Sequence, residues 1–148
     1  MNLSEYIIES CSSTFPLFGY SLEFLSESSE ENLNSAEEVN VLIGLSNGLQ
    51  GNIVISFSKA VAMEIISTMM GGMRIENIDS MARSALGEMA NMLMGSTVSS
   101  TPTELVIELS PPTIVIGNDM YIMISNIPAK KLVFKVASHY LYISYAIQ

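Results

Sequence analysis

The sequence predicts an α+β fold in which a layer of helices, two of them long, packs on a mostly antiparallel sheet. Three observations predict it. Segments with helical spacing alternate with groups of strand-like segments, short turns join consecutive strands, and no linker divides the chain. The 148 residues, 49% of them apolar, are enough to bury one hydrophobic core, so we expect a single domain over residues 1–148.

The first part of the chain predicts a helix followed by a short strand and a loop. Apolar residues recur with helical spacing over Asn2–Thr14, and Pro16 ends that helix. Weak alternation predicts a short strand at Tyr20–Leu25. The tract Glu23–Glu38 is polar and rich in carboxylates, which is typical of a solvated loop.

A hairpin and two helices follow. Glu38–Ser46 and Gly51–Ser58 read as strands, and Asn47-Gly48 between them is a strong turn signal. Helical spacing returns over Lys59–Gly71. A second long helix begins near Ile78, with Asp79 or Ser80 as its cap, and ends at about Ser99.

The last part of the chain predicts strands only. The Pro111-Pro112 pair interrupts them, and the short Ser138-His139 connection predicts a terminal hairpin. The expected strands are Glu104–Leu109, Thr113–Ile116, Met120–Ser125, Lys131–Ala137 and Tyr140–Ala146.

Composition excludes several classes of function. Acidic residues outnumber basic ones 15 to 6, a net charge of −9 that argues against nucleic acid and anionic membrane as partners. No apolar run approaches the ~18 residues that span a bilayer, and Glu5 and Glu9 near the start are unlike a secretory leader. One cysteine and one histidine leave no thiolate or His-rich metal site. We therefore expect a cytoplasmic protein with no metal of its own and no membrane insertion.

One side of the second long helix carries the candidate functional residues. At ~100° per residue, Ser84, Glu88, Asn91 and Gly95 fall within a stripe roughly 60° wide. Apolar residues take the opposite side and are expected in the core: Ala82, Leu86, Met89, Ala90 and Leu93.

The stripe has an ordinary reading and a functional one. A carboxylate and an amide on a helix surface are often only its solvated face. Here their exposed neighbours are expected to be the small Ser84 and Gly87, and Met81 and Met92 border the stripe as adaptable candidates for partner contact. The chain offers no base or lysine beside them for nucleophilic catalysis. An amide can hold a water molecule, and a carboxylate can bind a cation, so the pair could complete an active site that another molecule supplies.

The segment SALGEMANMLMGS resembles the S/D-x-x-x-E-x-x-N-x-x-x-G signature of the CheC/CheX/FliY chemotaxis phosphatases. GLQGNIVISFSKAVAMEIISTMMGG is similar to the family's hairpin and helix, and ELVIELSPPTIVIGNDM to its strand and proline-containing loop. The resemblance covers about residues 1–146 and is strongest from Gly48 to Gly95. A second copy is missing, since Glu64 is followed by Ser67 where an asparagine would be needed, so the chain is most similar to CheX.

The resemblance implies a role for each residue of the stripe. Glu88 would pair with the active-site lysine of a phosphorylated response regulator, and Asn91 would align water for attack on its aspartyl phosphate. Ser84 would be supporting, and Gly95 would permit close helix packing. Mg²⁺ would be bound by the response regulator, and this chain would need no cofactor of its own. The family's proline usually lies farther from the asparagine than Pro111 and Pro112 do here, so neither is assigned a role.

The resemblance implies a phosphatase that acts on an aspartyl-phosphorylated CheY-like response regulator. The alternative is a catalytically silent module that binds a response regulator or a flagellar-switch component. A hydrolase of small molecules is a third reading, which the missing nucleophile and metal set disfavour. The resemblance also implies a homodimer formed by pairing sheet edges, and the apolar terminal hairpin, if left unpaired, would be such an edge, so we expect a homodimer.

Overall fold

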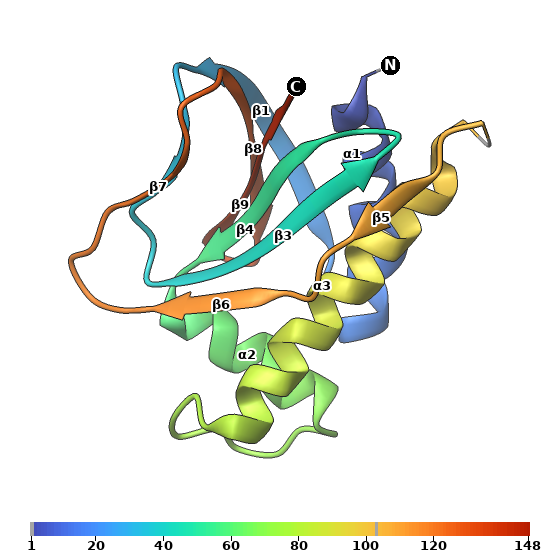
Figure 1. Cartoon of the computed structure of the whole chain (residues 1–148). Coiled ribbons are helices and arrows are strands. Elements are labelled where there is room, and N and C mark those ends of the chain that lie inside the picture. Colours follow the sequence, from blue (N-terminus) through green and yellow to red (C-terminus); the bar gives the residue numbers. More distant parts are fainter. Residues whose placement is uncertain (1, 103) are drawn as a thin grey trace.

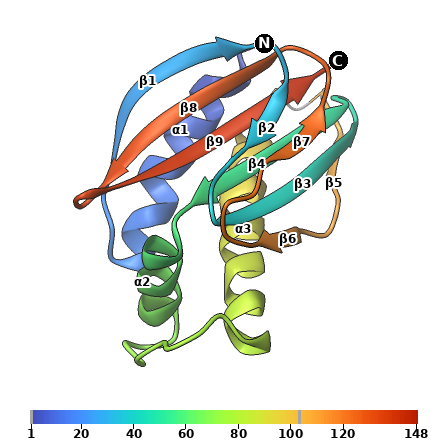
Figure 2. The ribbon, with the colours of Figure 1, turned by 90° about the vertical axis from the view of Figure 1, so that its left-hand side faces the viewer.

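A computed structural model describes residues 2–102 and 104–148 of the chain. Within this range, three α-helices lie on one face of a seven-stranded antiparallel sheet, and a two-stranded ribbon lies on the other face (Figures 1 and 2). This arrangement confirms the predicted helix layer on a mostly antiparallel sheet. Over the same residues, every helix is too short or too polar to cross a membrane.

The helices and strands follow the predicted order with adjusted bounds. The helices are α1 Leu3–Thr14, the 3₁₀ turn η1 Phe15–Phe18, α2 Lys59–Met69 and α3 Ser80–Ser100. The strands are β1 Leu22–Glu30, β2 Leu33–Ser35, β3 Val39–Asn47, β4 Gly51–Phe57, β5 Ile107–Leu109, β6 Thr113–Ile116, β7 Ile122–Ser125, β8 Ala129–Val136 and β9 His139–Ile147.

The large sheet has the order β1-β8-β9-β4-β3, and β5 and β6 both pair with the far side of β3. The predicted hairpin of β3 and β4 is confirmed, and Asn47 leaves β3 with a left-handed φ of 68°. The expected Met120–Ser125 strand is shortened to β7, which pairs with β2 in the separate ribbon instead of joining the large sheet.

The core lies between the helices and the inner face of the sheet. Alternate residues of β3 and β4, such as Val41 and Ile55, are fully buried there. The five residues of α3 predicted for the core are 0–1% exposed, which confirms the predicted orientation of that helix: Ala82, Leu86, Met89, Ala90 and Leu93. Each buried leucine of this kind contributes about 1.5–3 kcal/mol.

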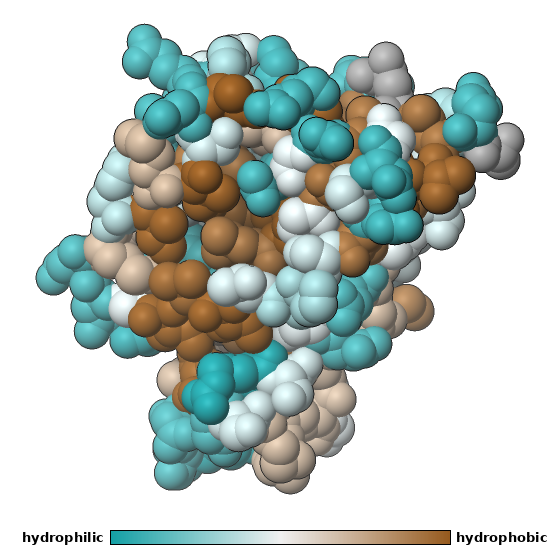
Figure 3. All heavy atoms as spheres, viewed as in Figure 1, coloured by the Kyte–Doolittle hydropathy of each residue, from teal (hydrophilic) through white to brown (hydrophobic). Residues whose placement is uncertain are grey.

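The outer face of the sheet has a smaller apolar cluster under the β2–β7 ribbon. Leu33 of β2 packs against Val54 and Ala146 of the sheet, and Ile124 and Ile127 extend the cluster toward solvent. Figure 3 shows apolar side chains gathered on this face around β6 and β7.

The acidic tract Glu23–Glu38 was expected to be a loop, and this prediction is wrong. Its first half is β1, and β2 follows. β1 is an edge strand with most of its side chains exposed, so it lacks the apolar alternation that marks a half-buried strand. Its partner β8 carries three of the six basic residues of the chain. Glu23 lies opposite Lys135, and Lys130 donates a hydrogen bond to Ser29 (Nζ–Oγ 2.8 Å). These cross-strand pairs favour the continuation of β1 to Glu30, beyond the predicted short strand Tyr20–Leu25.

The C-terminal hairpin is not a free edge. β8 pairs with β1, and β9 pairs with β4, so the hairpin lies inside the sheet. The argument for a homodimer from an unpaired terminal hairpin is therefore wrong. The homodimer itself stays a prediction, and β1 is the long strand that leaves its outer edge available for it.

The two glycines of α3 behave unlike the sequence-based expectation. Gly87 was expected on the exposed side, yet it is buried, and a Cβ added to it would lie 3.3 Å from Cγ of Pro112. Gly95 was expected to permit close packing, but a Cβ added there meets nothing within 4 Å among the residues that the structure describes. Close packing against α3 thus occurs at Gly87, where the loop between β5 and β6 crosses the helix.

Burial of Cys11 in α1 has a consequence for stability at alkaline pH. Burial raises the pKa of this thiol to about 12, whereas the pKa of an exposed thiol is about 8.5. Above the unfolded pKa the unfolded chain loses this proton first, so the free energy of unfolding should fall with rising pH from about 9 to about 12. Urea titrations at several pH values should show this fall in the wild type and lack this component in Cys11→Ala. Rapid reaction of the native thiol with a disulfide reagent at neutral pH would contradict the assignment.

The two glycines should respond differently to the same substitution. Alanine in a helix interior is favoured over glycine by about 0.5–1 kcal/mol. Gly95→Ala should gain this amount, because its new methyl group has open space. Gly87→Ala should gain less or lose stability, because Pro112 must move away. Thermal unfolding of the two variants side by side measures the difference, and equal shifts in Tm would disprove the proposed contact.

Candidate functional site

The candidate site lies on α3, where the helix passes the β5–β6 loop. Asp79 caps the helix by accepting a hydrogen bond from the backbone N–H of Ala82 (2.9 Å), as one of the two predicted caps. The N-terminal half of α3 projects beyond the sheet together with the end of α2 (Figures 1 and 2). Because the core fixes the rotation of α3, Ser84, Glu88 and Asn91 face outward and are exposed.

Glu88 and Asn91 open onto a shallow depression of about 490 Å³. α3 forms one wall, and the start of β6 with the loop before it forms the other. Its lining residues are Ser80, Arg83, Ser84, Gly87, Glu88, Asn91, Pro112 and Ile114. Three of the four stripe residues therefore share one concave surface, whereas Gly95 lies outside it.

Pro112 is a residue of this surface that the sequence-based reasoning did not assign. The spacing of Pro112 from Asn91 did not match the expected pattern, so nothing local to the proline indicated its position. In the structure Gly87 allows its ring to lie against α3, which places it in the same depression as Asn91. Arg83 and Ile114 were missed for the same reason, since each reaches the depression only through the fold.

The two bordering methionines are exposed, as a contact surface would require. Met81 is 64% exposed and Met92 is 36% exposed. Neither lines the depression, although Met81 directly follows its residue Ser80 and Met92 directly follows Asn91 along α3. Exposed thioether side chains can adapt to the shape of a partner. Their role in partner contact stays a prediction.

The chemistry of the depression is limited to polar contact and charge. Within residues 2–102 and 104–148, neither the Glu88 carboxylate nor the Asn91 amide has a hydrogen-bond or ion-pair partner, so both are available. Its described lining contains no histidine, cysteine or lysine. Over the same ranges, no three His, Cys, Asp or Glu side chains are grouped so as to hold a metal ion. Such a surface can bind a cation and orient a water molecule, but it does not contain an activated nucleophile.

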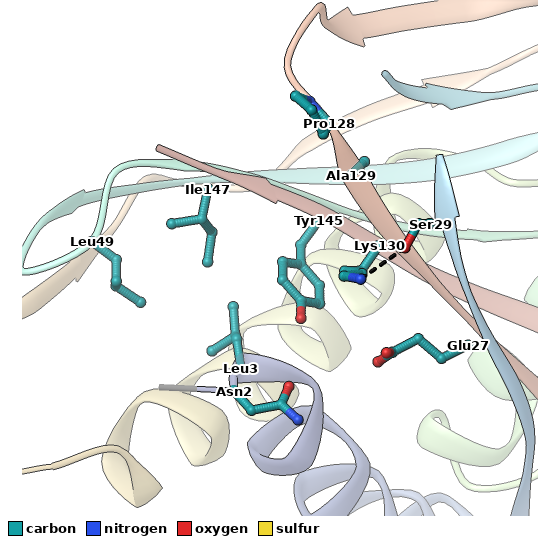
Figure 4. A pocket seen from close by; sticks show the side chains of 10 residues that line it. All are labelled: Asn2, Leu3, Glu27, Ser29, Leu49, Pro128, Ala129, Lys130, Tyr145 and Ile147. Atoms are coloured by element: carbon teal, nitrogen blue, oxygen red, sulfur yellow. Dashed lines mark hydrogen bonds between the residues drawn. The ribbon is translucent and has the colours of Figure 1, made fainter. Parts of the chain in front are cut away.

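A larger cavity, of about 580 Å³, lies elsewhere, between the start of α1 and the strands β1, β8 and β9 (Figure 4). Glu27 and Lys130 reach into it from β1 and β8, and the hydroxyl of Tyr145 is hydrogen-bonded to Ser4 (2.6 Å). Burial, as the largest cause, raises the pKa of Tyr145. Neither residue of the predicted pair lines this cavity, so we place the candidate site at the smaller depression.

Comparisons with known proteins bear on the family and the fold of this chain. The family model described as "Chemotaxis phosphatase CheX" matches residues 39–133. The curated protein "CheY-P phosphatase CheX" of Thermotoga maritima is 37% identical over 82 residues. That match covers 55% of this chain and 53% of the Thermotoga protein, so it spans about half the length of each.

Two solved structures have the same fold. A chemotaxis protein CheX from Desulfovibrio desulfuricans superposes with a TM-score of 0.88 at 16% identity, over 100% of both chains. A chain of the CheX–CheY–BeF3–Mg²⁺ complex from Borrelia burgdorferi superposes with a TM-score of 0.80 at 20% identity, over 99% of this chain and 98% of that one. At such identities the two structures support the fold. The family-model match covers most of the chain and includes α3 with its polar stripe, and on that ground this chain belongs to the CheX family of chemotaxis phosphatases.

Proposed function

We propose that this protein accelerates the dephosphorylation of an aspartyl-phosphorylated, CheY-like response regulator. The observation that carries the proposal is the exposed Glu88–Asn91 pair in a depression whose described lining has no histidine, cysteine or lysine to act as or activate a nucleophile. The pair forms an active site only when another molecule supplies the phosphoryl group, a metal ion bound to it and a cation that pairs with the Glu88 carboxylate.

Hydrolysis of an aspartyl phosphate needs little covalent chemistry from the catalyst. A water oxygen attacks phosphorus, the bond from phosphorus to the aspartate oxygen breaks, and inorganic phosphate and a free carboxylate result. The proton of the water passes to the phosphate. Because such transfers depend on positioning and charge stabilisation, an amide that holds the water in line is sufficient to accelerate them. Asn91 takes this part by accepting a hydrogen bond from the water with its side-chain oxygen.

Glu88 takes a different part, that of an anchor. It lies three residues before Asn91, on the same side of α3, so both side chains can reach one partner surface. Its carboxylate pairs with a lysine beside the partner's phosphorylated residue. The partner also carries the Mg²⁺. Ser84 and Pro112 shape the wall around the pair, and Met81 and Met92 contact the partner outside it.

Membership of the CheX family and the name of the Thermotoga relative support the substrate. The name of the Borrelia complex, in which a protein of this fold is bound to CheY with BeF3 and Mg²⁺, supports the partner. These names belong to those proteins, and the activity of this chain is tested directly as follows.

Replacing the two residues should affect different kinetic constants. Asn91→Ala should lower kcat by about 10²-fold or more while leaving KM for the phosphorylated regulator nearly unchanged, because the water loses its orientation. Glu88→Ala should mainly raise KM, by about tenfold, because the anchor is lost. Phosphate release from a phosphorylated CheY-family regulator, measured over a range of regulator concentrations, separates the two constants.

Matched controls are available on the same protein. Glu64→Ala removes an exposed carboxylate from α2, and Asn126→Ala removes an exposed amide from the β7–β8 turn; neither lines the depression. Both should keep the wild-type kinetics. Full activity of Asn91→Ala would sink the mechanism. Tight binding of the phosphorylated regulator by the wild type without any faster phosphate release would instead favour the silent binding module.

A further inference from the structure

A second groove, of about 440 Å³, continues the Glu88–Asn91 depression toward the start of α2. Its floor is apolar and comes from α2, from the segment before α3 and from β6, through Met63, Ile78, Ile114 and Ile116. Lys59 and Arg83 stand on its rim, and Glu76 and Asn77 complete it. Arg83 and Ile114 line both the groove and the depression, so the two hollows form one continuous surface.

Both cations on the rim are held in place by neutral groups. Lys59 donates from Nζ to Oδ1 of Asn118 (2.8 Å), and Arg83 donates from Nη1 to the backbone oxygen of Ile78 (3.1 Å). Across the described part of the chain the one ion pair joins Arg74 to Glu76 at 3.9 Å, so neither Lys59 nor Arg83 has a carboxylate partner. Both cations therefore retain donors for carboxylates from outside.

The carboxylates near the groove do not cancel this charge. Glu76, the one acidic residue of the lining, has Arg74 beside it. Two further carboxylates accept hydrogen bonds from backbone N–H groups at helix starts: Asp79 from Ala82 of α3 (2.9 Å) and Glu38 from Lys59 of α2 (3.0 Å). On a chain of net charge −9 with only six basic residues, two unpaired cations around one apolar floor are a local exception to the overall charge.

We propose that this groove is the second half of the docking surface for the phosphorylated regulator. It accepts an apolar side chain of that partner, flanked by carboxylates that bind Lys59 and Arg83. The inference rests on the proposed function and adds to it the chemistry of the partner's contact surface: acidic groups around an apolar residue, next to the phosphorylated centre. Arg83 lines both hollows, so a partner carboxylate bound to it lies next to the depression that holds Glu88 and Asn91.

Charge reversal at Arg83 tests the proposal. The probe is a BeF3-activated CheY-family regulator with Mg²⁺, and its affinity is measured by titration at about 0.05 M and about 0.3 M salt. Arg83→Glu should raise Kd at least about tenfold at the lower salt and should reduce the dependence of Kd on salt. The matched control, Lys135→Glu, makes the same change of net charge on β8, away from both hollows, and should stay within about twofold of the wild type.

Turnover assays extend the test to the chemistry. Under saturating regulator, Lys59→Glu, at a residue that lines the groove but not the depression, should keep kcat within about twofold while KM rises, because the water-holding amide is intact. A glutamate in the first turns of a helix is well tolerated, so both glutamate variants should fold; Arg83→Gln gives a second, milder replacement at Arg83. Met63→Gln, which makes the floor polar, should also raise Kd.

The outcomes separate the two proposals. If the wild type binds the activated regulator and speeds phosphate release, but Arg83→Glu and Lys135→Glu have equal Kd values, the groove is not a docking surface. The proposed function would still stand. A wild type that neither binds the activated regulator nor speeds phosphate release would overturn the proposed function and the groove together. A tenfold weakening confined to the groove variants supports both.

Discussion

The packing of α3 against the inner face of the sheet is the constraint on which the rest of the site depends. Leu86, Met89 and Leu93 are fully buried there, and this fixes the rotation of the helix about its axis. Turning the helix by one residue, about 100°, would carry the Glu88 carboxylate toward the core, at a cost of several kcal/mol for an unpaired buried charge. The outward direction of the polar pair is thus a consequence of the apolar side of the same helix.

The six basic residues of this acidic chain lie in two places. Lys130, Lys131 and Lys135 are on β8, beside the carboxylates of β1, where they serve the pairing of two strands. The other three are near α2 and α3: Lys59 begins α2, Arg74 lies between the two helices, and Arg83 is near the start of α3. The first group lies on a strand of the sheet, whereas Lys59 and Arg83 of the second group line the groove beside the candidate site. The net charge of −9 did not reveal these two groups, because it is a sum over all charged residues wherever they lie.

Local signals were sufficient for the parts of the fold that local interactions determine. The helical period of α3, the cap at Asp79 and the turn at Asn47 each depend on residues close in sequence, and the structure has all three. The predicted strand Tyr20–Leu25 covers only the start of β1, because the rest of this edge strand has exposed side chains without apolar alternation and its partner β8 lies about a hundred residues away.

The same distinction applies to the candidate site. Glu88 and Asn91 could be placed on one surface by counting along a helix. Pro112 and Arg83 could not, because their place beside the pair depends on where the β5–β6 loop crosses α3 and on how the depression joins the groove. The spacing of residues in the sequence shows which side of a single helix is polar. It does not show which loop packs against that helix, and this packing forms the depression.

The order of strands in the sheet has a consequence for how the chain acquires its structure. The hairpin of β8 and β9 lies between β1 and β4, so β1 has no neighbour in the sheet until β8, about a hundred residues later in the sequence, is in place. During synthesis, β3, β4 and the helices can pack together before β8 has been made, whereas β1 stays unpaired until then. Such long-range pairing slows folding and exposes strand edges meanwhile. Charged side chains on an unpaired strand oppose its association with other strand edges, and β1 carries three of them, Glu23, Glu27 and Glu30.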